Sequence, residues 1–157
     1  ELIAAAREIV PDIAIRTTFL VGYPNESEKE FEELHAFIKN IKFNRMGVFT
    51  YSHEEDTHAY KQYADNIPEE VKINRKNILM ETQQDISFQQ NLAMTGKNVK
   101  ILADRTEQGI HFGRTASDSP EVDNEVIIKS SVPVQPGNFY RARIYKADYY
   151  DLYAEIT

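Results

Sequence analysis

The sequence predicts an α/β segment followed by a small all-β domain, with one long helix between them. Three observations predict this order. Residues 1–52 alternate between helical patterns and apolar, β-branched runs, which is typical of parallel strands joined by helices. Residues 67–94 keep a helical pattern throughout. After Gly96, five short β-rich runs follow within about 60 residues, which favours a small closed barrel of the OB type.

The first segment is expected to contain two helices and two strands. Residues 2–10 suit an amphipathic helix, which the proline that follows ends. The run IAIRTTFLVG (13–22) is nearly continuous in apolar and β-branched residues, so we expect a strand that is covered on both faces. Ser27 and Glu30 have the spacing of a capping box at the start of the next helix. A second strand is expected at residues 45–52.

The middle of the chain is expected to form a loop and then the long helix. Residues 53–66 are polar and favour a loop, and Pro68 followed by two glutamates marks a helix N-terminus. Gly96 suits a C-cap. The expected apolar stripe of this helix consists of Val71, Ile78, Thr82, Ile86 and Ala93. The β-rich runs of the tail are 98–103, 109–116, 124–129, 138–147 and 149–157.

Composition excludes several classes of protein and site. The chain has no cysteine, which excludes disulfides and thiolate-bound metal clusters within it. No apolar run approaches the roughly 20 residues that span a bilayer. The formal net charge is −7, and residues 1–94 carry nearly all of it, so neither half has the basic surface that nucleic-acid binding favours. An acidic protein more readily attracts a basic partner.

Five segments of the sequence carry a resemblance to a known family. TTFLVGYPNESEKEFEEL (17–34) is similar to the fifth strand and following helix of a radical-SAM barrel, and FNRMGVFTYSHEEDTHA (43–59) is similar to its sixth strand. Residues 95–157 resemble a TRAM domain. Within them, GRTASDSPEVDNEV (113–126) and ADYYDLYAE (147–155) are similar to segments of the methylthiotransferase branch that modifies an aspartate. The resemblance covers essentially the whole chain.

The resemblance implies a fold and an activity. Residues 1–66 would be the C-terminal part of a radical-SAM (β/α) barrel, 67–94 a linker helix, and 95–157 a five-stranded, OB-like TRAM domain. Enzymes of this family bind one [4Fe–4S] cluster through cysteines of the barrel and a second one in an N-terminal domain. They use S-adenosylmethionine as radical source and methyl donor. The implied target is the β-carbon of an aspartate in the twelfth small-subunit ribosomal protein, in the cytoplasm.

The chain itself lacks the ligands for these clusters, because it has no cysteine. We therefore expect the clusters and the catalytic residues in other sequence. The first residue is Glu1 rather than an initiator methionine, which favours a chain that begins inside a longer protein. This chain alone is expected to bind neither iron nor S-adenosylmethionine and to be inactive.

The ends of the two predicted strands are the candidate cofactor site. Ligands of parallel α/β barrels collect at the C-terminal ends of strands, and the resemblance implies that these ends line the S-adenosylmethionine pocket. The residues assigned to cofactor binding on this basis are Arg16, Thr18, Gly22, Glu26, Phe49 and Tyr51. The alternative is a plain turn between a strand and a capped helix, because short motifs often mislead.

Three of these residues have specific expectations. Arg16 lies within an apolar strand, and a buried arginine needs a partner, either cofactor or substrate inside the barrel or an acid at the strand edge. Gly22 would allow a close approach of the backbone to a ligand, or a positive φ. Phe49 and Tyr51 are two residues apart and are expected on one side of their strand, against adenine or in the core.

The tail supplies the candidates for substrate binding. They are Arg114, Asp118, Glu121, Asp123, Tyr149 and Asp151. The acidic residues from Asp118 to Glu125 have no basic residue between them, so they would repel phosphate and attract a basic protein. The expected partner is therefore the basic ribosomal protein rather than tRNA, and no membrane.

Two other functions stay open from the sequence. Aromatic and basic groups of the tail, such as Phe139 and Arg141, can stack bases and contact phosphate, as the sister enzyme that modifies an adenosine in tRNA would need. The chain could also be a non-enzymatic binding module. His53 and His58 flank three acidic residues, but their spacing matches no structural zinc pattern, so we expect no metal ligand here.

Overall fold

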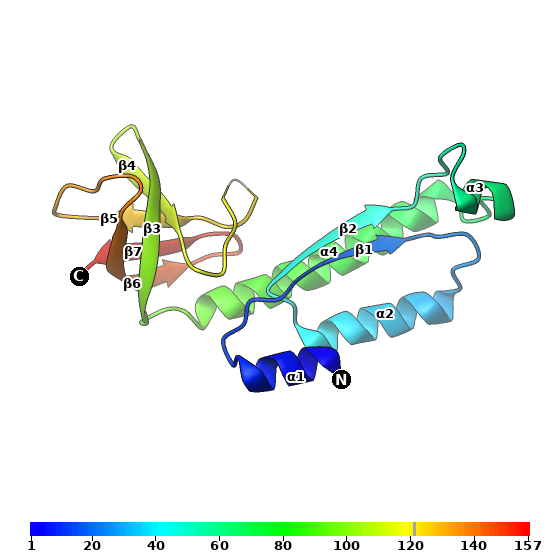
Figure 1. Cartoon of the computed structure of the whole chain (residues 1–157), viewed down its shortest axis with the longest axis horizontal. Coiled ribbons are helices and arrows are strands. Elements are labelled where there is room, and N and C mark those ends of the chain that lie inside the picture. The colour runs from blue at the N-terminus through cyan, green and yellow to red at the C-terminus, as the bar shows by residue number, and fades with distance from the viewer. Residues whose placement is uncertain (121) are drawn as a thin grey trace. The chain divides into compact units, whose positions relative to one another are not determined.

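In the computed structural model, which describes residues 1–120 and 122–157, the chain divides into two units, Glu1–Ile86 and Ser87–Thr157 (Figure 1). The helices are α1 (Leu2–Ile9), α2 (Glu28–Ile41), α3 (His58–Gln62) and α4 (Glu69–Leu92). The strands are β1 (Arg16–Val21), β2 (Arg45–Thr50), β3 (Asn98–Glu107), β4 (Ile110–Arg114), β5 (Val126–Lys129), β6 (Phe139–Ala147) and β7 (Leu152–Ile156). None of the helices among the described residues is long and apolar enough to span a membrane.

β1 and β2 form a two-stranded parallel sheet, which confirms the predicted α/β pattern. Their register pairs Arg16 with Arg45 at the first residues of both strands. α2 connects the strands and begins with the predicted capping box. The Glu30 N–H donates to Ser27 Oγ at 3.3 Å, and the Ser27 N–H donates to Glu30 Oε2 at 2.7 Å. These bonds satisfy backbone donors at the start of α2 that have no partner within the helix.

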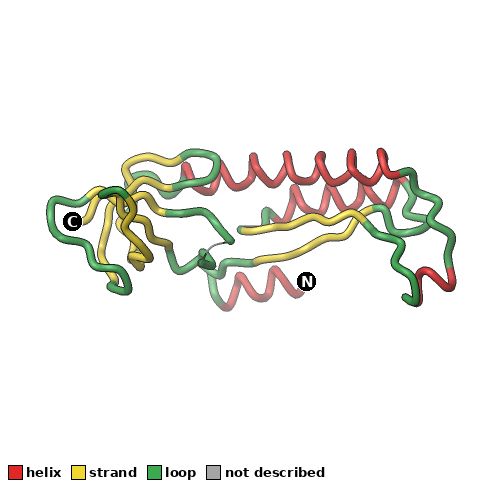
Figure 2. Tube along the Cα trace, turned by 90° about the horizontal axis from the view of Figure 1, so that it is seen from above, coloured by secondary structure: helices red, strands yellow, loops and turns green. Residues whose placement is uncertain are grey.

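Within the first unit, all of whose residues the structure describes, only one face of this sheet is covered, so the prediction of a strand buried on both faces is wrong. Figure 2 shows α2 and the beginning of α4 on the same side of the two strands. The core on that side consists of Val21, Phe31, Ile38, Phe43, Met46, Val48 and Leu79. On the other face Leu20 is 50 % exposed and Phe49 is 62 % exposed. Arg16 lies on this open face and is exposed, which corrects the expectation of a buried arginine.

α4 is buried along a different stripe from the predicted one. Its most buried residues between Glu69 and Ile86 are Lys72, Arg75, Leu79 and Gln83. The predicted apolar stripe is at most half-buried, and Ala93 is exposed. The reason is that long polar side chains cover the core with their aliphatic stems while their end groups reach backbone and carboxylate acceptors. A prediction from the positions of the apolar residues alone therefore identifies the wrong face of α4 as the buried one.

The segment predicted as a loop contains a short helix. α3 (His58–Gln62) is capped at its N-terminus by Thr57, whose Oγ1 accepts a hydrogen bond from the Tyr60 N–H at 3.2 Å. The turn after β1 is tied to the residues before α4. Asn25 adopts φ 69°, and its N–H donates to Asn66 Oδ1 at 2.9 Å.

The second unit contains a closed five-stranded barrel, as the sequence predicts. The strand order is β3–β4–β5–β7–β6, in which β5 and β7 are parallel and the other neighbours antiparallel. Its core consists of Ile101, Ala103, Val126, Ile128, Ala142, Ile144, Leu152 and Ala154. The alternation of buried and outward residues along each strand produces this interior.

Two local features affect the strands of the barrel. Gly113 of β4 pairs with Ala103 of β3, and a Cβ there would overlap the carbonyl oxygen of Leu102 and meet Ile128 Cδ1 at 3.1 Å. The last strand begins three residues later than predicted, because Asp148 holds a turn. Asp148 Oδ1 accepts hydrogen bonds from the backbone N–H groups of Tyr150 at 3.0 Å and Asp151 at 2.8 Å.

Candidate functional site

A cluster of buried charges lies at the C-terminal ends of β1 and β2. We call Gly22, Glu26, Tyr51, Lys72 and Arg75 the strand-end cluster. Gly22 and Tyr51 follow the strands directly, Glu26 lies in the turn after β1, and the two cations come from the first turns of α4. Lys72 is 2 % exposed and Arg75 is 5 % exposed. Buried cations need paired acceptors, and each of these two has them.

Lys72 joins the end of β2 to the segment before α4. Its Nζ donates to Asp65 Oδ2 at 2.7 Å and to the carbonyl oxygen of Tyr51 at 3.4 Å. The ammonium also lies 5.4 Å from the centre of the Tyr51 ring. The hydrogen bond from Lys72 lowers the pKa of Asp65, and burial raises the pKa of Tyr51.

Arg75 joins α4 to the turn after β1. Its Nη1 donates to Glu26 Oε1 at 2.6 Å and to the Glu26 carbonyl oxygen at 3.2 Å, and its Nη2 lies 3.1 Å from Glu28 Oε2. Glu26 Oε1 also accepts the Gly22 N–H at 3.1 Å. One carboxylate thus closes the turn from residue 22 to 26 and anchors it to α4.

Gly22 is required by its own backbone and by Lys72. Its φ is +76°, a conformation that L residues with a side chain rarely adopt. A Cβ at this position would overlap Lys72 Cγ and lie 3.0 Å from Lys72 Cδ. The positive φ confirms one of the two predicted roles of this glycine. The space that the missing side chain leaves is filled by Lys72.

Tyr51 and Phe49 do not share one side, which corrects the expectation from their spacing. Phe49 is 62 % exposed on the open face, whereas Tyr51 is 7 % exposed. β2 ends at Thr50, so the alternation of the strand no longer applies to Tyr51. The Tyr51 hydroxyl is 2.9 Å from His53 Nδ1, and His53 lies 4.6 Å from the Tyr60 ring. Among the described residues no group of three His, Cys, Asp or Glu side chains could hold a metal ion.

The open face of the sheet carries a different set of groups. Arg16, Thr18 and Leu20 alternate outward along β1, and Phe49 pairs with Leu20 in the register. Gly47 lies opposite Thr18. A Cβ at Gly47 would meet only Thr18 Oγ1, at 3.8 Å, so this part of the face is uncrowded.

In the barrel, several predicted substrate residues bond to neighbours. Arg114 Nη1 lies 2.9 Å from Asp104 Oδ1. Asp118 Oδ2 accepts from Thr115 Oγ1 at 2.6 Å, and Asp123 Oδ2 accepts from the Ser119 N–H at 2.7 Å. Glu121 lies outside the described residues.

The last two predicted substrate residues, Tyr149 and Asp151, lie just before the start of β7. Asp151 Oδ1 accepts the Glu125 N–H at 3.0 Å and so ties the starts of β5 and β7, and burial raises the pKa of Asp151. Tyr149 is 45 % exposed and stacks on Phe88 of α4, with ring centres 4.3 Å apart.

One carboxylate of the acidic segment between Asp118 and Glu125, that of Glu125, is paired with a cation in the structure. Arg105 of β3 donates to both carboxylate oxygens of Glu125 and, from Nε, to Glu107 at 2.6 Å. These carboxylates hold the pKa of Arg105 above its usual value. The compensating charge comes from a neighbouring strand, which a search along the loop cannot find.

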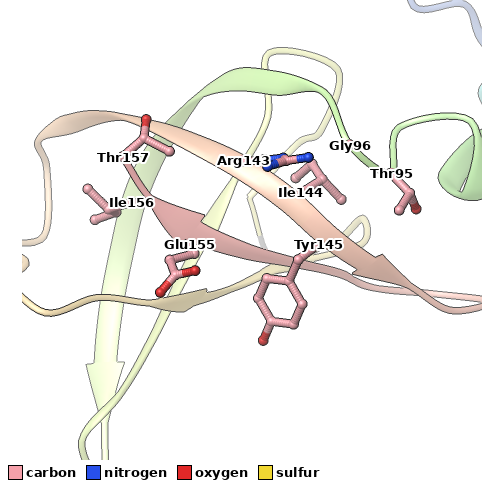
Figure 3. Close-up of a pocket in the computed structure, with 8 residues that line it drawn as sticks. All are labelled: Thr95, Gly96, Arg143, Ile144, Tyr145, Glu155, Ile156 and Thr157. Carbon is pink, nitrogen blue, oxygen red and sulfur yellow. The ribbon is translucent and has the colours of Figure 1, made fainter.

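Among the hollows on the described part of the barrel surface, two bear on the predicted sites. One, of about 380 Å³, is lined by Lys100, Leu102, Arg114, Thr115, Ala116, Asp118 and Phe139, and so contains two of the predicted substrate residues. The other, of about 400 Å³, is lined by the residues in Figure 3, from the segment before β3, from β6 and from the end of β7. It contains none of the predicted substrate-binding residues.

Comparison with known proteins gives two kinds of match. Residues 95–157 match the TRAM domain family. The chain is 46 % identical over 156 residues to ribosomal protein uS12 methylthiotransferase RimO of Parabacteroides distasonis, which covers 99 % of this chain and 36 % of that protein. It is 48 % identical over 159 residues to the protein of the same name from Porphyromonas gingivalis, covering 100 % of this chain and 37 % of the relative.

The chain belongs to the uS12 methylthiotransferase family. It spans about a third of the length of these relatives. The counterpart from Bacteroides thetaiotaomicron is 47 % identical over 157 residues and gives the same coverage. The closed barrel of this uS12 methylthiotransferase family member is its TRAM domain.

The predicted cofactor residues of this methylthiotransferase family member fall into two groups. Arg16, Thr18 and Phe49 lie on the open face of the sheet. Gly22, Glu26 and Tyr51 belong to the strand-end cluster, where protein groups occupy their polar atoms.

The sequence interpretation missed the two cations of this cluster. Lys72 and Arg75 recur with Leu79 and Gln83 at helical spacing, which is the signal that could have found them. They were not found because charged residues on a helix are usually solvated.

Proposed function

We propose that this chain is part of an enzyme that methylthiolates the β-carbon of an aspartate in ribosomal protein uS12, with S-adenosylmethionine and two [4Fe–4S] clusters as cofactors. The observation that carries the proposal is the identity of 46–48 % over essentially the whole chain to proteins of that name. The clusters would be bound by cysteines elsewhere in the protein, because this chain has none. The chain alone would therefore be inactive.

The open face of β1 and β2 would belong to the lumen of a radical-SAM barrel. In such barrels helices cover the outside and the inner face of the sheet lines the site. The arrangement of α2 and α4 on one face only supports this assignment. The remaining strands would pair with the edges of β1 and β2, since unpaired strand edges are a liability in a folded protein.

Arg16, Thr18 and Phe49 have the chemistry to hold S-adenosylmethionine. A guanidinium suits a carboxylate, a hydroxyl suits an amino group or a ribose, and an aromatic ring suits adenine. Gly47 leaves space beside Thr18 for such a ligand. The cofactor would supply the radical and the methyl group, and these side chains would bind and orient it. Gly22, Glu26 and Tyr51 would shape the pocket through the backbone that they hold.

The TRAM domain would recruit uS12. Arg114 and Asp118 line the hollow that also contains the exposed ring of Phe139, so this hollow is the proposed contact. Exposed aromatic groups in a concave surface are frequent anchors of protein partners. Tyr149 and the acidic residues Asp123 and Asp151 would lie at the periphery, and Glu121 is included on its sequence alone. The net charge of −7 favours a basic partner for the chain as a whole, although nearly all of it lies in residues 1–94.

The proposed division of the chain follows the same assignment. Residues 1–66 would be the barrel portion, 67–94 the linker helix and 95–157 the TRAM domain. α4 contributes Lys72 and Arg75 to the first unit and Phe88 to the second, so the linker helix is packed into both. We propose that the enzyme is cytoplasmic.

A tRNA methylthiotransferase is not favoured. The named relatives are uS12 methylthiotransferases. A direct competition tests the assignment: the full-length protein is titrated with labelled uS12 in the presence of unlabelled tRNA. We expect uS12 to bind more tightly, with an affinity that falls as salt is added, because the attraction is partly electrostatic. Displacement of uS12 by tRNA at equal concentration would reverse the assignment.

A further inference from the structure

The face of α4 that packs on the first unit is unusually polar. Lys72, Arg75 and Gln83 are 2 %, 5 % and 5 % exposed, and Leu79 is the one apolar residue of this stripe that is fully buried. A helix that only covered a sheet would be expected to present leucine or isoleucine there. The burial of these polar residues therefore needs an explanation other than covering the apolar core of the sheet.

Each of the two cations donates a hydrogen bond to a backbone carbonyl in the segment that follows a parallel strand. Lys72 Nζ donates to the Tyr51 carbonyl after β2, and Arg75 Nη1 donates to the Glu26 carbonyl at the end of the turn after β1. Figure 1 shows α4 running alongside both strands, which allows one helix to reach both ends. Backbone contacts of this kind fix the path of a loop.

The contacts with Glu26 fix the turn at two points. Its Oε1 accepts the Gly22 N–H at 3.1 Å and Arg75 Nη1 at 2.6 Å. The charge-assisted bond orients the carboxylate, and the carboxylate orients the Gly22 amide. Lys72 supports the other side of Gly22, because its stem fills the space where a Cβ would lie. Segment 22–26 is thus held by α4 from two directions.

Stability alone is a weak reason for this arrangement. Buried ion pairs often add little to stability compared with apolar residues of similar volume, since removing charges from water is costly. Arg75 Nε is also buried without a hydrogen-bond partner, a further cost. What the pairs supply is a defined geometry at two strand ends.

We propose that Lys72 and Arg75 are positioning residues for S-adenosylmethionine binding, which from α4 fix the backbone of segments 22–26 and 51–53 at the cofactor side of the sheet. They touch neither cofactor nor substrate. This inference rests on the proposed function, because it assumes that these strand ends border the cofactor pocket. It adds that α4 sets the affinity for the cofactor.

The test uses the full-length protein with its clusters reconstituted. Lys72→Met and Arg75→Met keep an aliphatic stem and remove the charge, and Arg75→Lys keeps the charge. Gln83→Met is the matched control, because Gln83 is as buried on the same face of α4 but donates to the Phe43 carbonyl before β2, at 3.1 Å. The measurements are the Kd for S-adenosylmethionine by equilibrium dialysis and amide hydrogen exchange in residues 22–26 and 51–53 by mass spectrometry.

We expect Lys72→Met and Arg75→Met to raise the Kd about tenfold. Arg75→Met should speed exchange in residues 22–26, where Arg75 holds Glu26, and Lys72→Met should speed exchange in residues 51–53, where the Lys72 charge bonds to the Tyr51 carbonyl. KM for the cofactor should rise more than kcat falls. Arg75→Lys should give a Kd between those of the wild type and Arg75→Met, since a charge can still reach Glu26 but the fork of the guanidinium to Glu26 and Glu28 is lost. Gln83→Met should leave the Kd and the rate of hydrogen exchange unchanged. If Lys72→Met fails to fold, the two Arg75 variants carry the test.

A wild-type Kd in Arg75→Met, or an equal rise in Gln83→Met, would overturn the inference. Failure of the wild-type protein to bind S-adenosylmethionine would instead overturn the proposed function. In that case the exchange measurement alone tests whether Arg75 positions the turn. Unchanged exchange in residues 22–26 of Arg75→Met refutes this role, and faster exchange supports it.

Discussion

The side chain of Lys72 occupies the space in which Gly22 would carry a Cβ. Lys72 Cδ and Lys72 Cβ would lie 3.0 and 3.1 Å from such an atom, and Lys72 Cγ would overlap it. The same lysine reaches the Tyr51 carbonyl with its ammonium. A single side chain from α4 therefore packs against the end of one strand with its stem and bonds to the end of the other with its charge.

Gly22→Ala should destabilise the chain by about 2–4 kcal/mol, from the strained positive φ and the overlap with Lys72 together. The measurement is urea denaturation followed by circular dichroism. Gly47→Ala is the control in the same unit, because a Cβ there meets only Thr18 Oγ1, at 3.8 Å.

A double-mutant cycle separates the two causes. In a Lys72→Ala background, Gly22→Ala should cost only the conformational part, about 1–2 kcal/mol. An undiminished cost in that background would mean that the contact with Lys72 contributes nothing.

The ion pair of Asp65 and Lys72 should make stability depend on pH. The hydrogen bond from Lys72 lowers the pKa of Asp65 in the folded state. A depressed carboxyl pKa contributes stability that is present above the unfolded pKa and is lost as pH falls through the folded pKa. The stability difference between wild type and Asp65→Asn should therefore be larger at pH 7 than at pH 3. A difference that stays constant over this range would show that the pair does not act in this way.

The sequence predicted well those elements that depend on turns, caps and residue patterns within a short stretch of the chain. The capping box of Ser27 and Glu30, the positive φ of Gly22 and the five strands of the barrel all follow from short-range patterns. Each depends on residues close together in the chain, so one sequence is enough to find it.

The sequence failed where the partner comes from a distant segment. Arg105 pairs with Glu125 across 20 positions, and Arg75 pairs with Glu26 across 49. No periodicity connects such residues. The open face of β1 was missed for a related reason: an apolar run indicates that a strand can be covered on both faces, but not which segments cover it.

The hollow beside Phe139 should be the contact for uS12. Phe139 is 61 % exposed and outside the core, so Phe139→Ala should change stability by less than about 0.5 kcal/mol. We expect it to weaken binding of uS12 about tenfold, as loss of an aromatic anchor does. Tyr145→Ala is the matched control, since Tyr145 is 49 % exposed on the same strand but lines the other hollow. Calorimetric titration of the full-length variants with uS12 measures both, and equal affinities would place the contact elsewhere.

The most direct measurement is the identity of the product. The full-length protein, with reconstituted clusters and a reductant, is incubated with S-adenosylmethionine and a mixture of uS12 and tRNA, and both are digested and analysed by mass spectrometry. A methylthio group on one aspartate of uS12, with the tRNA nucleosides unchanged, is the predicted result. A methylthio group on adenosine, with uS12 unmodified, would contradict it.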